Sequence, residues 1–352
     1  MKKPSIALWL RQQRISRFRM EERRKRKGRR RVPAENRYVA PGELIQAPIK
    51  FDLTRGSGKA VVKFLRAVAA SVLKLKTAVR LDFRLTESFY PAGTLLLCAE
   101  IDRIVTLSDL AKPVTLLDPR SRRAREVMKQ IGIYEITGDS CDVVPEREDV
   151  VYWKSMKGAD QSGEQLAVLE SVAERVNKAH ARQLELSGAW RGVTEAVANS
   201  VEHAYKRPRK DGFTGLEQTK WWMFTQLRDA TFTMAVCDLG CGYRATIDQT
   251  VPELFVSEIA ATFKGVNRDA TAIHTAMEYG RSGTQLAERG KGSRDAMSVI
   301  QRHKDGELVI FSNTGWMSYE YQSGKESSRS HGDLGIDIGG TVIWWKLPLG
   351  VT

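Results

Sequence analysis

Helical and strand periods of hydrophobic residues alternate from residue 51 to about residue 145. Three segments repeat with the period of an amphipathic helix: Ala60–Leu75, Thr94–Ile104 and Ser121–Gly132. Two shorter segments have strand character: Val79–Leu85 and Val114–Leu117. Because alternating strands and helices predict a sheet with covering helices, we expect a small α/β domain over residues 51–145.

Beyond residue 145 the pattern indicates a larger part that also mixes helices and strands. Residues 146–184 begin as a charged link and continue as a helix expected at about Gly163–Leu186. Strand-like segments then form two hairpins, with turns at Arg228–Ala230 and Thr314–Gly315. A last strand is predicted at Gly340–Trp345.

Two stretches of this larger part lack a clear periodic pattern. Residues 260–289 contain several glycines, which is typical of a mobile loop that covers a site. Residues 322–335 are polar and are predicted to form a loop before the last strand.

The positive charge is concentrated at the N-terminus. The chain of 352 residues has a net charge of +14, and residues 1–35 hold 14 Lys or Arg against 3 Glu, a net charge of +11. Residues 1–50 are therefore predicted to be a basic arm and a proline-marked linker without stable structure of their own. Trp9 and Phe18 among the basic residues suit contact with nucleic acid. A solvated tail and an anionic membrane surface are the alternatives.

The remaining composition is that of a soluble globular protein. No run of about 18 apolar residues occurs, so no membrane span is expected. The short apolar segment before Arg11 does not suffice for a signal peptide. The four cysteines, Cys98, Cys141, Cys237 and Cys241, show no paired metal-ligand spacing. We therefore expect a reduced, cytoplasmic protein without a zinc site.

A polar stripe marks the helix around Glu195. Glu195, Asn199 and His203 recur every four residues and would share one face, while the opposite face is small or apolar. A carboxylate can take a proton from an attacking water or hydroxyl. An amide oxygen can bind a hard cation such as Mg²⁺. The alternative is an ordinary solvated helix face.

Glycines follow or precede several of the predicted elements. The strand that ends at Asp238 is followed by Gly240 and Gly242, which places an acceptor for an exocyclic amine beside backbone that a base can approach. The segment RGKGS opens a predicted helix, whose first N–H groups can bind phosphate. The last strand begins with a Gly-Thr pair.

The order E-x-x-x-N, D-x-G-x-G, G-x-G and G-T over residues 185–348 resembles the GHKL ATPases, which include gyrase, histidine kinases and MutL. The helix sequence EAVANSVEHAY is most similar to the anti-sigma-factor serine kinases of that family. The resemblance implies a two-layer α/β sandwich of the Bergerat type over residues 185–352, with ATP and Mg²⁺ as cofactors. It implies Glu195 as the general base, Asn199 as the Mg²⁺ ligand and His203 on the same nucleotide-binding face.

The resemblance also implies which residues bind the base and the phosphates. Asp238 would accept a hydrogen bond from the adenine amine, supported by Thr341, with Gly240 and Gly242 next to the base. The residues that would border the lid over the phosphates are Arg289, Gly290, Lys291, Gly292 and Ser293.

Residues 81–101, LDFRLTESFYPAGTLLLCAEI, resemble the STAS domains of anti-anti-sigma factors. In those domains a buried strand, a turn and the start of a helix form the phosphorylation and docking surface. The resemblance implies a smaller STAS-like α/β domain on the N-terminal side. Ser88 and Thr94 are candidate phosphoacceptors, and helix capping is the simpler role for both hydroxyls.

These features predict an ATP-binding regulatory protein whose nucleotide state controls the binding of a protein partner. The chemistry would be Mg²⁺-dependent ATP hydrolysis or phosphoryl transfer to a protein hydroxyl, as in an ATPase or a serine/threonine kinase. One alternative is a non-catalytic ATP-dependent interaction switch. Another is a DNA-associated ATP clamp, similar to MutL, that uses the basic arm. The sequence leaves open whether ATP is hydrolysed and whether the protein is a homodimer.

Overall fold

The computed structural model of the chain describes residues 42–54, 56–151, 154–159, 174, 186–213, 220–281 and 291–349. The basic arm of residues 1–35 and most of the helix predicted at about Gly163–Leu186 lie outside these residues. In the described part of the chain, no helix combines the length and the hydrophobicity that crossing a bilayer requires.

A small parallel sheet organises the N-terminal part, with the strand order β1-β3-β5. Its strands are β1 (Glu43–Gln46), β3 (Val79–Asp82) and β5 (Val114–Leu117). Four helices connect or follow these strands: α2 (Gly58–Ala69), α3 (Pro91–Leu107), α4 (Arg122–Gln130) and α5 (Ile133–Thr137). A parallel pair of two-residue strands completes it: β2 (Lys50–Phe51) and β4 (Ser88–Phe89). We call residues 42–139 the N-terminal layer; the predicted alternation of strands and helices is confirmed there.

Strand β1 lies in the stretch that the sequence pattern assigns to the linker. Its sequence, ELIQ, offers only two apolar residues between Pro41 and Pro48, so no strand period is visible. Its backbone is held by β3: Glu43 N–H donates to Ala78 O at 3.1 Å, and Ala47 N–H donates to Asp82 O at 2.9 Å. The ordered part of the chain therefore includes residues 42–50, and the prediction of a linker up to residue 50 was wrong for them.

Helix α3 begins three residues before the predicted start. Pro91 occupies its first turn, where the missing N–H costs nothing, and Thr94 N–H donates to Tyr90 O at 2.9 Å. The Thr94 side chain is completely buried, and its hydroxyl has no hydrogen-bond partner among the described residues. Thr94 therefore neither caps the helix nor offers an accessible hydroxyl for phosphorylation, whereas Ser88 is half-buried on β4.

Seven antiparallel strands form the larger sheet, in the order β11-β10-β9-β12-β8-β7-β6. Their bounds are β6 (Lys154–Gly158), β7 (Trp221–Arg228), β8 (Thr231–Asp238), β9 (Gly306–Ser312), β10 (Gly315–Gln322), β11 (Lys325–Asp333) and β12 (Thr341–Pro348). Both predicted hairpins, β7–β8 and β9–β10, are confirmed. Residues 322–335, predicted as a loop, instead contain the edge strand β11. Its polar side chains are mostly exposed, and backbone pairing with β10 needs no hydrophobic alternation.

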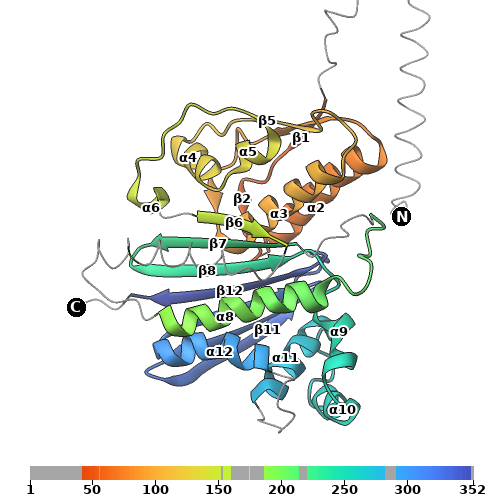
Figure 1. Cartoon of the computed structure of the whole chain (residues 1–352), viewed down its shortest axis with the longest axis vertical. Coiled ribbons are helices and arrows are strands. Elements are labelled where there is room, and N and C mark those ends of the chain that lie inside the picture. Colours follow the sequence, from red (N-terminus) through yellow and green to blue (C-terminus); the bar gives the residue numbers. More distant parts are fainter. Residues whose placement is uncertain are drawn as a thin grey trace, which may run out of the picture. The chain divides into compact units, whose positions relative to one another are not determined.

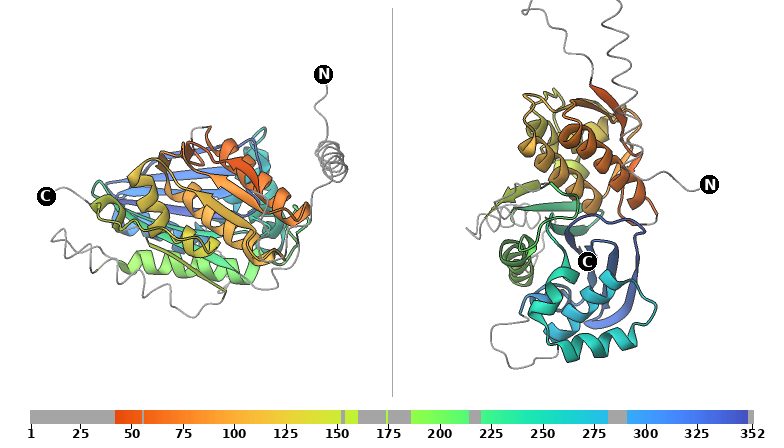
Figure 2. Two further views of the ribbon diagram at one scale, coloured as in Figure 1. Left: turned by 90° about the horizontal axis from the view of Figure 1, so that it is seen from above. Right: turned by 90° about the vertical axis from the view of Figure 1, so that its right-hand side faces the viewer.

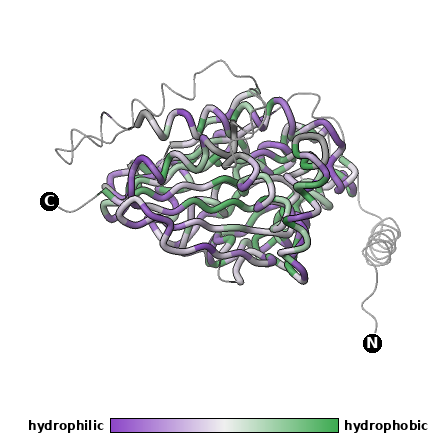
Figure 3. The backbone as a smooth tube through the Cα atoms, turned by 90° about the horizontal axis from the view of Figure 1, so that it is seen from below, coloured by the Kyte–Doolittle hydropathy of each residue, from purple (hydrophilic) through white to green (hydrophobic). Residues whose placement is uncertain are grey.

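The two faces of the larger sheet belong to different hydrophobic cores (Figures 1 and 2). Trp221 and Met223 pack against a helical layer made of α8 (Leu186–Asn199), α11 (Arg268–Arg281) and α12 (Lys291–His303). Trp222 and Phe224 join the core of the N-terminal layer, where α3 contacts β7, β8 and β12. Figure 3 shows hydrophobic stretches along the strands and hydrophilic turns at their ends. Both tryptophans are therefore packing residues, and the central strands are buried on both faces.

The glycine-containing stretch of residues 260–289 is largely helical where it is described. After α9 (Tyr243–Thr250) and α10 (Glu253–Thr262), helix α11 begins at Arg268. It buries Ala270, Ile273 and Met277 at helical spacing in the core. The prediction of a mobile loop was therefore wrong for residues 268–281, and residues 282–290 lie outside the described part. The remaining short helix is α6 (Glu148–Val151).

Candidate functional site

Asp238 ends strand β8 and pairs in register with Thr341, the first residue of β12. Its side chain is 8% exposed, and Oδ1 accepts the N–H of Gly240 at 2.9 Å. Burial raises the pKa of this carboxyl to about 6, although the N–H groups of Gly240 and Thr341, the charge of Arg209 and the Ser200 hydroxyl oppose the rise. No Lys, Arg or His of the described residues forms an ion pair with Asp238. It is thus a buried acid without a directly bound cation.

The glycines after Asp238 are required by the packing of the turn itself. A Cβ at Gly240 would overlap the carbonyl of Ala204, which accepts the N–H of Cys241 at 2.8 Å. Gly242 has a φ of +76°, and a Cβ there would overlap the side chain of Asn313. Contacts within the protein therefore explain why both positions are glycine. The two glycines by themselves do not indicate that a nucleotide base approaches this backbone.

Helix α8 presents Glu195 and Asn199 at half-buried positions, while its opposite side is buried in the core with β8 and β12. Tyr243, at the start of α9, connects this helix to the end of β8. Burial raises the pKa of the Tyr243 phenol, and the charges of Asp238 and Glu195 raise it further. The charges of both predicted site residues, Asp238 and Glu195, therefore act on the same phenol.

The helix changes from α to π geometry at Ser200 and ends at Ala204. Ser200 Oγ donates to Ala196 O at 2.9 Å and also lies within reach of the Asp238 carboxylate, so its single proton can serve one of them at a time. The sequence pattern places Ser200 among the small residues of the packing face of the helix. Its contact with Asp238 becomes visible only when the π segment packs on the end of β8.

His203 lies in the π segment that continues α8, four positions after Asn199. Its Nδ1 lies 3.0 Å from Lys206 Nζ, and its Nε2 lies 3.8 Å from a carboxylate oxygen of Glu202. Burial and the charge of Lys206 lower its pKa. The structure thus shows His203 with two charged neighbours on its own segment.

Two residues at the end of β9 also hold the turn, and sequence reasoning missed both. Asn313 Nδ2 donates to Cys241 O at 3.1 Å, and Ser312 Oγ accepts the N–H of Tyr243 at 3.0 Å. Both side chains are buried. They lie more than sixty positions along the chain from the turn, so no local pattern could have identified them.

The predicted phosphate-side residues are only partly described. Helix α12 begins at Lys291, so residues 291–293 form its first turn, and the prediction that RGKGS opens a helix is confirmed for them. Helix α12 packs against α8 and α11. Arg289 and Gly290 lie outside the described residues.

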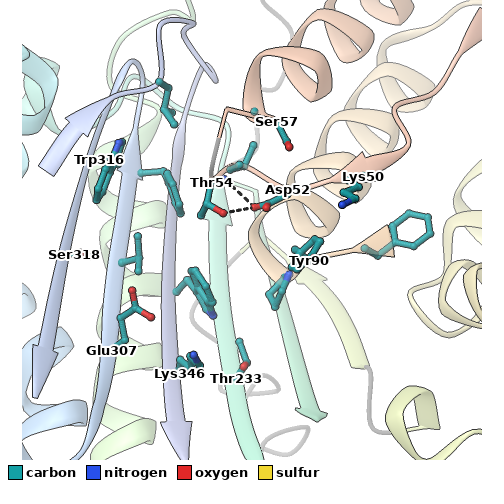
Figure 4. Close-up of a pocket in the computed structure, with 18 of the residues that line it drawn as sticks. Lys50, Asp52, Thr54, Ser57, Tyr90, Thr233, Glu307, Trp316, Ser318 and Lys346 are labelled. Carbon is teal, nitrogen blue, oxygen red and sulfur yellow. Dashed lines mark hydrogen bonds between the residues drawn. The ribbon is translucent and has the colours of Figure 1, made fainter. Parts of the chain in front are cut away.

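A separate cleft of about 1140 Å³ lies between the larger sheet and the segment that joins β2 to α2 (Figure 4). Thr233, Ser318 and Lys346 contribute to its floor, and Tyr90 contributes to its wall. Thr233 and Asp238 are an odd number of positions apart on β8, so they point to opposite faces of the sheet. The cleft is therefore distinct from the Asp238 region.

Comparison of the sequence with models of known protein families finds no match, and comparison with curated proteins finds none either.

Proposed function

We propose that the chain is an ATP-binding regulatory protein in which Asp238 accepts a hydrogen bond from the amine of adenine. The proposal is carried by one observation: the buried Asp238 carboxyl has N–H and O–H neighbours but no directly bound cation among the described residues. An acid already paired with Lys or Arg has its acceptor sites occupied, whereas this one can accept from a neutral exocyclic amine. Thr341, its register partner, is buried beside it.

The residues of α8 fit a magnesium ion shared with phosphates. Asn199 is half-buried, one turn after Glu195. A carboxamide oxygen is a ligand that Mg²⁺ accepts while it keeps most of its shell for water and phosphate. The described residues contain no cluster of three or more His, Cys, Asp or Glu that could hold a metal. When bound, Mg²⁺ would neutralise the charge that develops on the phosphates.

Glu195 is the residue of this chain that we propose to move a proton. Its half-buried carboxylate would take the proton of a water molecule or a protein hydroxyl whose oxygen attacks the terminal phosphorus of ATP. The new oxygen–phosphorus bond forms as the bond to ADP breaks, and the products are ADP with phosphate or with a phosphorylated protein.

The arrangement of elements supports the same family-level interpretation. A sheet with α8, α11 and α12 on one face is compatible with the two-layer Bergerat sandwich of the GHKL ATPases. The order of strands and helices in the N-terminal layer is compatible with a STAS-like domain. Because folds host unrelated functions, the proposal rests on Asp238 and α8, and the likeness of fold only adds to it.

Calorimetric titration of Asp238→Asn with ATP and Mg²⁺ tests the proposal. An amide NH₂ facing the adenine amine places two donors together, which costs about 1–3 kcal/mol, or roughly 10- to 100-fold in affinity. Asp229→Asn is the matched control, because Asp229 is exposed on the turn of the same β7–β8 hairpin. Unchanged ATP affinity in folded Asp238→Asn protein would refute the assignment of Asp238.

A further inference from the structure

Four charged side chains form a cluster between the N-terminal layer and the end of the larger sheet. Glu100 and Arg103 come from α3, and Arg209 and Asp211 come from the loop that follows the π segment. Arg209 donates to Glu100, Arg103 donates to Asp211, and Arg103 Nε lies 3.4 Å from Glu100. The Arg103 side chain is 1% exposed and that of Arg209 is 13% exposed. We call these residues the Arg209 cluster.

The cluster is electrically balanced but costly to bury. Burial opposes the charged form of Arg209, but the carboxylates of Glu100 and Asp211 outweigh it and raise the Arg209 pKa. Four buried guanidinium nitrogens, Nε and Nη1 of both Arg103 and Arg209, still have no hydrogen-bond partner among the described residues. Since apolar residues of similar volume often stabilise such a position better, stability alone is a weak explanation for the cluster.

Arg209 also contacts the turn that leads into Thr341. Its Nη2 lies 3.4 Å from Ile338 O, and a Cβ at Gly339 would overlap the guanidinium. Gly339 has a φ of +68°, so two constraints make it a glycine. At the next residue, a Cβ on Gly340 would overlap Asp238 O. One guanidinium thus lies between helix α3 and the backbone beside Asp238.

We propose that Arg209, held by Glu100, is a positioning residue for Asp238, so that helix α3 of the N-terminal layer is a structural component of the nucleotide site. The inference rests on the proposed function. It deepens that function by naming the connection through which a change at the N-terminal layer reaches the adenine-binding acid. A displacement of α3 moves Glu100, Glu100 moves Arg209, and Arg209 changes both the turn at residues 338–340 and the field at Asp238.

Among the described groups that act on the Asp238 carboxyl, Arg209 supplies the positive charge. The titratable and charged groups whose fields interact with Asp238 are Tyr205 and Arg209 of the loop, Cys237 and Cys241 at the end of β8, and Tyr243 of α9 next to Glu195. The others are neutral or acidic. Removal of the Arg209 charge should therefore make Asp238 harder to ionise.

Three variants of the full chain separate positioning from general stability. Arg209→Met removes the charge and leaves Glu100 with Arg103 as its remaining cationic partner, whereas Arg209→Met with Glu100→Gln removes both charges and keeps the fold testable. Arg209→Lys keeps the charge without the planar fork. Arg123→Met is the matched control, because Arg123 is a partly buried arginine that pairs with Asp149 in the N-terminal layer.

The first measurement is the pH at which ATP affinity is half-maximal, by calorimetry between pH 5 and 9. Wild type and Arg123→Met should share a midpoint set by Asp238. In Arg209→Met the midpoint should rise by about 1 pH unit or more, and in the double variant by less. Arg209→Lys should keep the midpoint near that of wild type while its ATP affinity falls several-fold. Equal midpoints in wild type and both Met variants would overturn the proposal.

The second measurement needs no nucleotide. The pH dependence of the unfolding free energy is compared with and without Asp238→Asn in each background, which isolates the titration of Asp238. The difference in unfolding free energy between the proteins with Asp238 and those with Asp238→Asn should keep changing up to a higher pH in the two Arg209→Met backgrounds than in wild type. If wild type binds no ATP at any pH, the proposed function fails, and this second measurement still decides whether Arg209 controls Asp238. Coincident profiles in all backgrounds would refute the positioning role.

Discussion

Two buried aspartates, one on each side of the larger sheet, have very different neighbours. Asp102 of α3 is 4% exposed, lies 2.6 Å from Lys157 Nζ and 3.8 Å from Lys220 Nζ, and accepts the indole N–H of Trp222 at 3.2 Å. Asp238 is similarly buried, but among the described residues it has no directly bound cation, and its pKa is raised by burial to about 6. Asp238 is therefore a buried acid with a raised pKa, and such groups are common at functional sites, whereas Asp102 is held by basic partners.

Asp82 of β3 is also buried, but its pKa is shifted in the direction opposite to that of Asp238. Arg84 donates to both of its oxygens, at 2.9 and 2.7 Å, and these hydrogen bonds lower the Asp82 pKa despite burial. In the N-terminal layer, Asp82 and Asp102 are thus compensated by basic partners. The four predictions that follow test whether Asp238 and its neighbour Glu195 behave differently from these compensated acids.

The largest expected effect is on turnover. Glu195→Ala should lower the rate of ATP hydrolysis about 10²- to 10⁴-fold, because a general base acts in the transition state, and should leave ATP affinity nearly unchanged. Phosphate release and calorimetry measure the two quantities, with Glu202→Ala, an exposed site about two turns further along, as the control. Equal losses of turnover and affinity would make Glu195 structural. A wild type that binds ATP without turnover would favour the non-catalytic switch.

The second effect is a pH-dependent difference in stability. The Asp238 pKa is about 6 in the folded chain against 3.8 as its reference, so the folded state binds the proton more tightly. Its contribution to stability is fully present below the reference pKa and is lost as pH rises through about 6. Relative to wild type, Asp238→Asn should therefore gain about 2 kcal/mol in unfolding free energy between pH 4 and pH 7.5, most of the limit set by 1.36 kcal/mol per unit of pKa. Urea unfolding across that range measures it, and parallel profiles would contradict it.

Asp102→Ala should affect stability and not ligand binding. The substitution leaves the buried Trp222 N–H without its acceptor and Lys157 without its partner, a loss of about 1–3 kcal/mol in unfolding free energy. Lys157 is half-exposed and can be solvated, so the ion pair adds little. Asp109→Ala, in an exposed pair with Lys76, is the control and should leave stability unchanged. A loss of ATP affinity as large as that of Asp238→Asn would remove the contrast between the two acids.

Deletion of the basic arm should have the smallest effect on the properties that depend on Asp238 and Asp102, namely ATP affinity and stability. Deletion of residues 1–35 removes a net charge of +11 and should change neither ATP affinity nor the stability of residues 42–349. If the arm binds nucleic acid, retention on DNA should fall with salt at a log–log slope near −0.9 per phosphate contact, and only in the intact chain. Salt dependence that is identical in the intact and truncated chains would indicate a solvated tail.

Much of the fold follows from local sequence patterns. The β7–β8 hairpin turns at Asp229 and Ala230, both at positive φ, and the alternation on either side gives its register. The resemblance to the GHKL ATPases implies that Thr341 lies near Asp238, and the two residues are paired in the register of β12 against β8. Local patterns did not predict two strands. The residues of β11 show no hydrophobic alternation, and the four residues of β1 form a strand only because they pair with β3.

The surroundings of the site could not be predicted, because they are assembled from distant segments. Arg209 is a surface-type residue in a turn-rich stretch, and only the approach of Glu100, 109 positions earlier, shows that most of its side chain is covered. Asn313 joins the turn at Cys241 across 72 positions. The change from α to π geometry at Ser200 could not be predicted either, because no sequence period distinguishes the two helical geometries over a single turn.

The central claim, that Asp238 accepts from the adenine amine, is tested most directly with ATP and purine riboside triphosphate, which lacks only the 6-amino group. In wild type, loss of that group should lower affinity about 10- to 100-fold, because the buried carboxylate loses the donor that satisfies it. In Asp238→Asn the analogue should bind at least as well as ATP, since the clash between two donors is gone. If both proteins lose the same factor on removal of the amine, Asp238 does not recognise adenine and the account is wrong.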